Sequence, residues 1–311
     1  MKFKISILII SISYSLIVGS GFYGFGNDYY AAYGLGDLGW GKWFDRAGYI
    51  VASMVINNTH IGVYITSFVL AISTLILTRS FFKVKKINSL IYFLFISIIS
   101  IHTWPIIMST SNAMKQGLCM SFLFLSISYY FKNKTLNSFL FIFLSIFFHK
   151  TGIFFFSIYL SLIFIIFIKS KVINFHNYIY FYYGLFLLGF YYVFLPEIYY
   201  ITEESTRIVG SDSRAVFLFL ILLFISFFTY KSNYLKNNYI LFLYLFSFVS
   251  SSLLFHGQNW QYERLIMMVV IPYVFAIGIV YNKISVYYIF TFSFSILLFL
   301  TISYGMYSSL K

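Results

Sequence analysis

Residues 60–77 read HIGVYITSFVLAISTLIL and carry no acidic or basic side chain apart from the leading histidine. The hydrocarbon core of a bilayer is about 30 Å thick and takes about 20 apolar helical residues, so this stretch predicts a membrane-spanning helix. The whole chain is similar in kind: of its 311 residues 61% are hydrophobic, 24% aromatic and only 9% charged. A soluble domain carries about a quarter charged residues, so a soluble enzyme, a disordered chain, a coiled coil and a disulfide scaffold are excluded.

Further apolar stretches follow along the chain. They predict an all-α, polytopic membrane helical bundle that forms a single domain over residues 1–311. The first stretch resembles a signal peptide because Lys2 and Lys4 precede it, but it has no convincing small-residue cleavage site and is retained as a span. About eleven spans are predicted, at residues 5–21, 60–77, 89–104, 112–131, 136–148, 151–168, 178–195, 215–230, 239–255, 265–281 and 286–304.

The charged residues between the spans predict the orientation. With a cytoplasmic N-terminus, 13 of the 21 cations lie inside, all eight acids lie outside, and the C-terminus is outside. This satisfies the positive-inside rule and predicts a multi-pass membrane protein. The net charge of +13 therefore serves topology, and nucleic acid is not an expected partner. The inner cations are Lys2, Lys4, Arg79, Lys83, Lys85, Lys86, Lys132, Lys134, Lys169, Lys171, Lys231, Lys236 and Lys283.

Polar residues suited to chemistry gather on the predicted outer side, which holds four of the five arginines. The inner loops are short and carry only anchoring cations, which disfavours enzymes that use cytosolic ATP or nucleotide sugars. The outer loop 22–58 contains an apolar segment, 47–57, that predicts an interfacial or re-entrant helix. The outer loop 196–213 is interpreted either as a solvated loop or, through Arg207 and the following Arg214, as an electropositive clamp.

Two further groups lie at outer ends of spans. Lys115, Gln116 and Cys119 follow Asn112 at offsets that share one helix face, and they predict either a snorkelling lysine or a polar stripe that lines a cavity. His149 lies between apolar runs and is either a turn residue or a hydrogen-bonding or acid–base group. No second histidine stands at a metal-ligand spacing, so no metal site is expected.

The central motifs resemble one family. NAMKQGLCMSFLFLSISYY at 112–130, the lysine turn after it and FLSIFFHKTGIFF at 143–155 resemble the EpsG/Wzy family of bacterial polysaccharide polymerases. That family shows an Asn-x-x-Arg-Gln element that opens a span and, about thirty residues later, Phe-His-x-small. The matching positions are Asn112, Lys115, Gln116, Phe148, His149 and Thr151, and the early Asp28-Tyr29 and late Arg264 are also similar to the family. Lys115 departs from the usual arginine, which keeps the charge but loses the planar fork.

The resemblance implies a membrane glycosyltransferase that joins undecaprenyl-diphosphate-linked repeat units on the outer leaflet without a cofactor. It implies the lipid-linked oligosaccharide, membrane lipid and a chain-length regulator protein as partners. Such chemistry needs a base at the acceptor hydroxyl and cations at the diphosphate. The alternative, a lipid-linked oligosaccharide flippase or transporter, is disfavoured by the clean inner halves of the spans. The candidate bases are His149, Asp28, Asp45 and Glu263, and the candidate substrate-binding residues are Arg46, Asn112, Lys115, Gln116, Arg207, Arg214 and Arg264.

Overall fold

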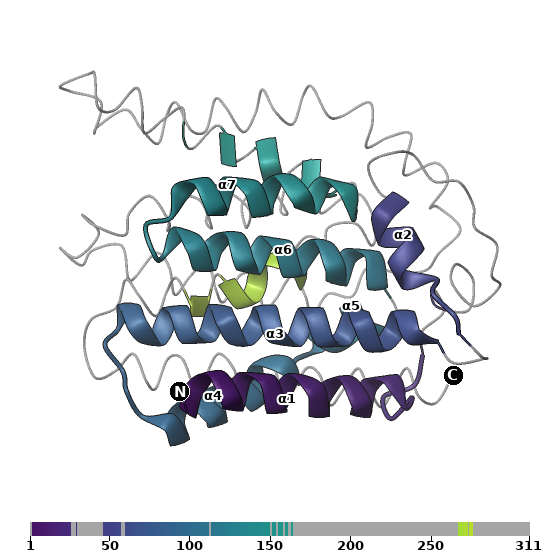
Figure 1. Ribbon diagram of the computed structural model, residues 1–311, viewed down its shortest axis with the longest axis horizontal. Coiled ribbons are helices and arrows are strands. Elements are labelled where there is room, and N and C mark those ends of the chain that lie inside the picture. Colours follow the sequence, from purple (N-terminus) through teal and green to yellow (C-terminus); the bar gives the residue numbers. More distant parts are fainter. Residues whose placement is uncertain are drawn as a thin grey trace, which may run out of the picture. The chain divides into compact units, whose positions relative to one another are not determined.

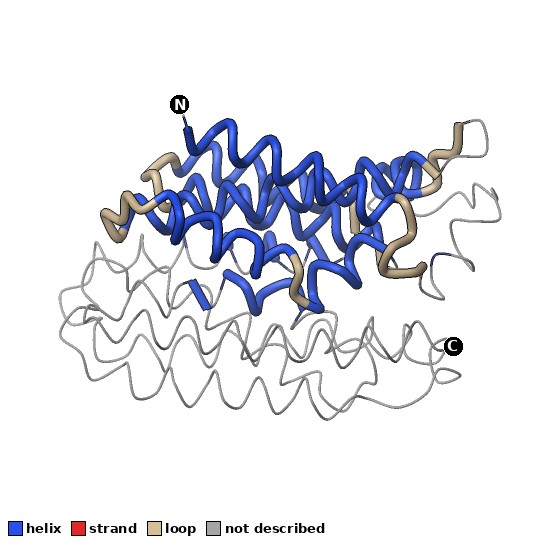
Figure 2. Tube along the Cα trace, turned by 90° about the horizontal axis from the view of Figure 1, so that it is seen from below, coloured by secondary structure: helices blue, strands red, loops and turns tan. Residues whose placement is uncertain are grey.

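The structure is a computed structural model, and it describes part of the chain. The described residues are 2–25, 29, 46–56, 60–111, 113–149, 151–153, 155–157, 159–160, 163, 267–272 and 274–275. The chain divides into two compact units, Met1–Phe156 with Asn282–Lys311, and Ser157–Tyr281. Within the described ranges the chain is mostly helical and forms no β-strand, as the all-α prediction requires (Figure 2). In the second unit, residues 267–272 and 274–275 are helical and buried.

The first unit contains seven described α-helices, and four of them lie side by side in the order α1, α3, α6, α7 (Figure 1). Helix α2 lies against one end of α6, α4 packs mainly on α3, and α5 packs on both α3 and α6. The bounds are α1 Lys2–Gly19, α2 Arg46–Ala52, α3 Ile61–Val84, α4 Leu90–Ile101, α5 Trp104–Ser111, α6 Met114–Tyr130 and α7 Thr135–Leu144, with a 3-10 turn at Ser145–Phe147.

Two of these helices, α1 and α3, are long and apolar enough to cross a membrane, within the part of the chain that the structure describes. A third span results if Leu90–Ile101 and Pro105–Ser111, which are bent by 56° against each other, form one broken or re-entrant unit. The protein is therefore built as a membrane protein. The eleven spans and the N-in/C-out orientation stay predictions.

The interior of the first unit contains many small hydroxyl side chains beside large buried ones such as Phe82 and Phe124. Ser11, Thr74 and Ser128 are fully buried, and each donates a hydrogen bond to the carbonyl four residues earlier, at 2.7–2.8 Å. These bonds satisfy the hydroxyls within their own helices. On α1, by contrast, Ile9 and Leu16 are each 58% exposed. Small residues between helices allow close approach, and large apolar side chains on the outer surface are typical of helices that face lipid.

Other serine hydroxyls form hydrogen bonds between helices. Ser15 of α1 donates to the carbonyl of Tyr64 in α3 at 2.7 Å. Ser126 of α6 donates to the carbonyl of Ser138 in α7 at 2.8 Å, and the two hydroxyl oxygens lie 3.0 Å apart. Because no water competes in the hydrocarbon, each of these bonds helps to fix the register of a helix pair.

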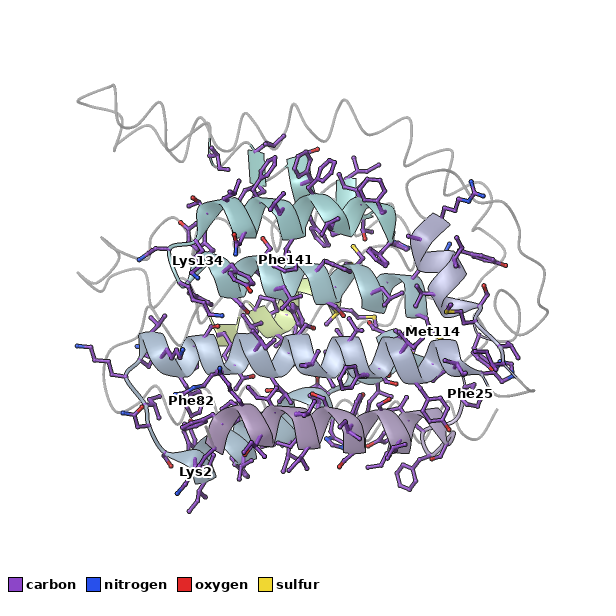
Figure 3. The ribbon with its side chains drawn as sticks, viewed as in Figure 1. Lys2, Phe25, Phe82, Met114, Lys134 and Phe141 are labelled. Atoms are coloured by element: carbon purple, nitrogen blue, oxygen red, sulfur yellow. The ribbon has the colours of Figure 1, made fainter. Side chains whose placement is uncertain are left out.

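Cationic turns gather at one end of the helix row. Figure 3 places Lys2 and Lys134 at this end, and Phe25 and Met114 at the opposite end. Burial lowers the pKa of Lys132, and the positive charges of Lys83 and Lys134 lower it further, so the turn after α3 lies near the turn between α6 and α7. This grouping agrees with the predicted placement of these lysines on one side of the membrane.

Three helices have other bounds than the approximate predicted segments, each with a local cause. Helix α3 continues past residue 77 to Val84, because Arg79 is accommodated with its guanidinium carbon 3.6 Å from the centre of the Phe3 ring. The predicted span 89–104 is broken after Ile101, because Pro105 lacks the N–H that would continue the helix and disfavours helical backbone before it. The predicted helix 47–57 ends at Ala52, because the chain turns back to α3 and Gly62 donates to the carbonyl of Met54 at 3.0 Å.

Candidate active site

Helix α2 brings Arg46 and Tyr49 to the end of the bundle where α6 begins. It contacts α3, α6 and the 3-10 turn that precedes Phe148. The close approach of α2 to Phe148 depends on Gly48, which is buried. A Cβ at this position would overlap the backbone carbonyl oxygen of Phe148. A backbone atom cannot rotate away as a side chain can, so only glycine permits this contact. Arg46, the first residue of α2, is exposed at the edge of the contact.

Lys115 occupies the first turn of α6, and its ammonium lies 5.5 Å from the centre of the Tyr49 ring. A cation at this end of a helix is repelled by the helix dipole, by about 0.3–1 kcal/mol. The face of the Tyr49 ring offsets this cost, since a cation–π contact contributes about 0.5–1 kcal/mol at a partly exposed site. The two residues therefore tie α2 to the start of α6.

Gln116 lies beside Lys115 but points into the bundle, where it is 1% exposed. The next residue, Gly117, packs on the end of α5: a Cβ there would overlap the carbonyl oxygen of Ser109 and lie 3.3 Å from Cγ2 of Thr66. The start of α6 therefore packs closely on the backbone of α5 and on the Thr66 side chain of α3, with the amide of Gln116 buried beside this contact. A buried amide is costly in a membrane and is a typical mark of a functional interior. The burial of Gln116 fits a polar stripe, and the two interpretations of Lys115, a snorkelling lysine and a polar stripe that lines a cavity, stay predictions.

His149 follows the 3-10 turn and is 5% exposed. Its Nδ1 accepts a hydrogen bond from the backbone N–H of Thr151 at 3.2 Å and lies 2.8 Å from Oγ1 of Thr151. The same Oγ1 lies 3.7 Å from Sγ of Cys119, a buried cysteine on α6. Next to His149, the ring of Phe148 stacks on Phe122 of α6 with 4.5 Å between centroids. These contacts hold Phe148, His149 and Thr151 against the N-terminal half of α6.

Three separate sequence motifs therefore meet at one place, which we name the α2–α6 junction. Of the predicted site residues, Arg46, Lys115, Gln116 and His149 belong to it. Figure 3 shows Met114, the first residue of α6, at this end of the bundle. The α2–α6 junction consists of Arg46, Gly48, Tyr49, Lys115, Gln116, Cys119, Phe148, His149 and Thr151.

The other predicted site residues lie outside the described residues: Asp28, Asp45, Asn112, Arg207, Arg214, Glu263 and Arg264. All eight acids of the chain fall outside the described ranges, so the described part of the α2–α6 junction contains cations and neutral polar groups and no carboxylate. In that same part of the chain, no group of three or more His, Cys, Asp or Glu side chains is placed to hold a metal ion.

The sequence alone missed two members of the α2–α6 junction, Gly48 and Tyr49. A glycine within an apolar helical segment signals a close backbone approach, but the approaching atom, the carbonyl of Phe148, is a hundred residues further along the chain. Tyr49 is one of 30 tyrosines, and its sequence neighbourhood does not distinguish it from those that anchor at the membrane interface.

Comparison with known proteins gives one match. Among curated proteins and among solved structures, none matches the chain. The family model described as the EpsG family matches residues 4–309, which is nearly the full length and includes every residue of the α2–α6 junction. The motifs around Lys115 and His149 and the extent of this match lead to the same conclusion: the chain belongs to the EpsG family, which is related to the Wzy-type polysaccharide polymerases.

Proposed function

We propose that the protein is a membrane glycosyltransferase that polymerises lipid-linked oligosaccharide repeat units on the outer face of the bacterial cytoplasmic membrane. The observation that carries the proposal is the α2–α6 junction, where Arg46, Lys115, Gln116 and His149 converge from three segments. Membership of the EpsG family supports the same class of activity. The inner loops offer only anchoring cations, which suits a donor lipid that arrives already activated.

In the proposed reaction, the hydroxyl oxygen of the acceptor repeat unit forms a bond to the anomeric carbon of the donor glycan. The bond between that carbon and the oxygen of undecaprenyl diphosphate breaks, and the diphosphate leaves with the bonding electrons. The hydroxyl proton passes to a base, for which Asp28, Asp45 and Glu263 are carboxylate candidates on the predicted outer side.

The cations have a definite part in this reaction. Negative charge concentrates on the leaving diphosphate, and donors fixed in advance around it lower the barrier. Arg46 and Lys115 lie at the α2–α6 junction, and we propose that Arg207, Arg214 and Arg264 complete the set around the diphosphate. Gln116, with the family-like Asn112, supplies amide groups for the sugar or the phosphate. None of these cations serves topology, because positive charge on the outer side opposes the positive-inside bias.

Deletion in the native host, with surface glycan separated by length, tests the proposal. Loss of a polymerase leaves single repeat units and removes long chains, whereas loss of a flippase removes all surface glycan. Arg264→Ala is expected to abolish long chains while lipid-linked substrate accumulates, since an unpaired buried charge costs about 2–5 kcal/mol, or about thirty- to several-thousand-fold in rate. Arg264→Lys recovers only part of this, because the fork is lost. If alanine substitution at Arg264, Arg214 and Lys115 each left the glycan chain length unchanged, these cations would not bind the diphosphate and the proposed mechanism would be wrong.

A further inference from the structure

Arg79 differs from the other cations at its end of the bundle. Of the 13 cations on the predicted inner side it is the only arginine, and it lies within α3, which ends at Val84. Topology requires positive charge alone, which lysine supplies equally well. The planar guanidinium, in contrast, is suited to bidentate binding of phosphate. Anchoring therefore does not account for an arginine at this position.

Aromatic side chains from three helices fix the guanidinium of Arg79. The ring of Phe3 on α1 packs edge-on against Phe93 of α4, with 5.2 Å between centroids, and Phe93 packs edge-on against Phe82 of α3 at 5.6 Å. Phe82 and Phe93 are fully buried, so the Phe3 ring rests on a packed support. The guanidinium carbon of Arg79 lies 3.6 Å from the centre of the Phe3 ring. The cation is therefore held beside α1 and is not free to move as an exposed side chain would be.

The hydrogen bonding of this guanidinium is incomplete. Its Nη1 is buried and has no hydrogen-bond partner within the part of the chain that the structure describes, whereas the side chain as a whole is partly exposed. The Phe3 ring attracts the charge but offers no oxygen acceptor. None of the described residues is an acid, and the predicted topology places all eight acids on the opposite side of the membrane. Because part of the guanidinium is removed from water, an anion from outside the chain is attracted more strongly here than at an open surface.

Three lysines surround the pair of Phe3 and Arg79. Lys2 and Lys4 flank Phe3 at the start of α1, and Lys83 follows Arg79 by one turn of α3; all three are exposed. Figure 3 shows Lys2 and Phe82 at the same end of the bundle. A basic group of this kind at a membrane surface attracts anionic lipid headgroups.

We propose that Arg79, held by Phe3, binds the phosphate of an anionic phospholipid beside α1 and α3 at the predicted inner surface. The guanidinium donates hydrogen bonds to the phosphate oxygens, and Lys2, Lys4 and Lys83 add positive charge around the headgroup. The acyl chains have an apolar surface to follow on α1, where Ile5 is 47% exposed and Leu8 49% exposed.

The test is a titration of the purified full-length protein with phosphatidylglycerol in mild detergent, read by native mass spectrometry. Phosphatidylcholine with the same acyl chains is the reference lipid, because it carries a phosphate but no net charge. We expect phosphatidylglycerol to bind at least about fivefold more tightly, which is the effect of about one cation at an anionic headgroup. Equal affinity for the two lipids would overturn the proposal.

Substitution of Arg79 separates a site from diffuse attraction. Arg79→Met is expected to lower the affinity for phosphatidylglycerol about tenfold to a hundredfold, the effect of losing hydrogen bonds to a charged group. Arg79→Lys recovers only part of this loss, because the planar fork is absent. Lys134→Met is the matched control, since it removes one exposed cation from the turn between α6 and α7, and it is expected to cost about fivefold or less. An equal loss in Arg79→Met and Lys134→Met would overturn the proposal.

Substitution of Phe3 tests the site without any change of charge, and it decides the matter if Arg79→Met does not fold. Phe3→Leu removes the ring that holds the guanidinium and is expected to weaken binding about two- to fivefold. Phe3→Tyr keeps the ring face and is expected to bind as the wild type does. Wild-type affinity in Phe3→Leu would show that the guanidinium needs no support and would overturn the proposal.

Inorganic phosphate, added in large excess, distinguishes a lipid from a free anion as the ligand. We expect it to leave phosphatidylglycerol bound, because the acyl chains contribute to the affinity of the lipid alone. Displacement by inorganic phosphate would assign the site to free phosphate and overturn the lipid assignment. None of these measurements depends on polymerisation, so the outcome is separate from that of the proposed function.

Discussion

Addition of a single methyl group at Gly48, by Gly48→Ala, tests whether the α2–α6 junction is needed for activity. The Cβ of Gly48→Ala would overlap the carbonyl oxygen of Phe148, so α2 must move away from residues 148–151. Overpacking of this kind costs about 1–3 kcal/mol. At 1.36 kcal/mol for each factor of ten, the docked position of α2 becomes about five- to 150-fold less favoured. Alanine also strengthens the helix by about 1 kcal/mol, but it does so whether α2 is docked or not and therefore offsets none of this loss.

The assay is glycan chain length in the native host, at matched amounts of protein in the membrane. We expect Gly48→Ala to shorten the chains strongly, because Arg46 and Tyr49 leave the junction together with α2. Ile50→Ala is the matched control on the same helix, since Ile50 is 45% exposed and its truncation removes little packing. If Gly48→Ala and Ile50→Ala both kept wild-type chain lengths, the docking of α2 on Phe148 would be irrelevant to polymerisation.

Four other expectations follow from the same contacts. Lys115→Arg is expected to keep long chains and Lys115→Met to lose them, because charge is the property that the α2–α6 junction uses at this position. Ser126→Ala, which removes the bond to Ser138, is expected to lower stability in detergent by about 0.6 kcal/mol, measured by thermal unfolding. Burial lowers the pKa of Lys85 to about 8, so the folded protein loses this charge as the pH rises through that value. Between this pH and the ordinary lysine pKa the unfolded chain still holds the proton, so the free energy of unfolding increases with pH over this range. The resonance of ¹³C-methylated Lys85, identified by Lys85→Arg, is expected to titrate near pH 8. A reporter fused after Lys311 is expected to read outside, and one within residues 131–134 inside.

Hydropathy predicted the long apolar helices better than the shorter ones. The spans 5–21 and 60–77 correspond to α1 and α3, because a long apolar run in lipid has no alternative to a helix that satisfies its own backbone. Helices that end early depend on local events. A proline such as Pro105 can be recognised in the sequence as a residue that interrupts a helix. The end of α2 at Ala52, in contrast, depends on the hydrogen bond from Gly62 to the carbonyl of Met54, which the spacing of apolar residues does not predict.

For the candidate site, the sequence predicted which residues take part and on which side of the membrane they lie, but not which of them contact one another. Each of Lys115, Gln116 and His149 was singled out within its own segment, and the orientation placed all of them toward the outer face. Their meeting with α2 depends on contacts between segments far apart in the chain, such as Gly48 with Phe148 and Cys119 with Thr151. Local pattern carries no information on such pairs, so the α2–α6 junction became visible only in the structure.

The position of Lys115 shows why this junction suits an anion. Alone, the lysine is placed unfavourably: it lies in the first turn of α6, where the helix dipole repels it, and the predicted orientation puts it on the side of the membrane that disfavours cations. The Tyr49 ring offsets about as much as the dipole costs, so these two effects nearly cancel. A diphosphate at this position makes the position of Lys115 favourable, because the first turn of the helix and the ammonium group both attract the negative charge. The same two positive groups that repel each other in the absence of substrate then act together, which is why Lys115→Met should weaken substrate binding even though it relieves the dipole repulsion.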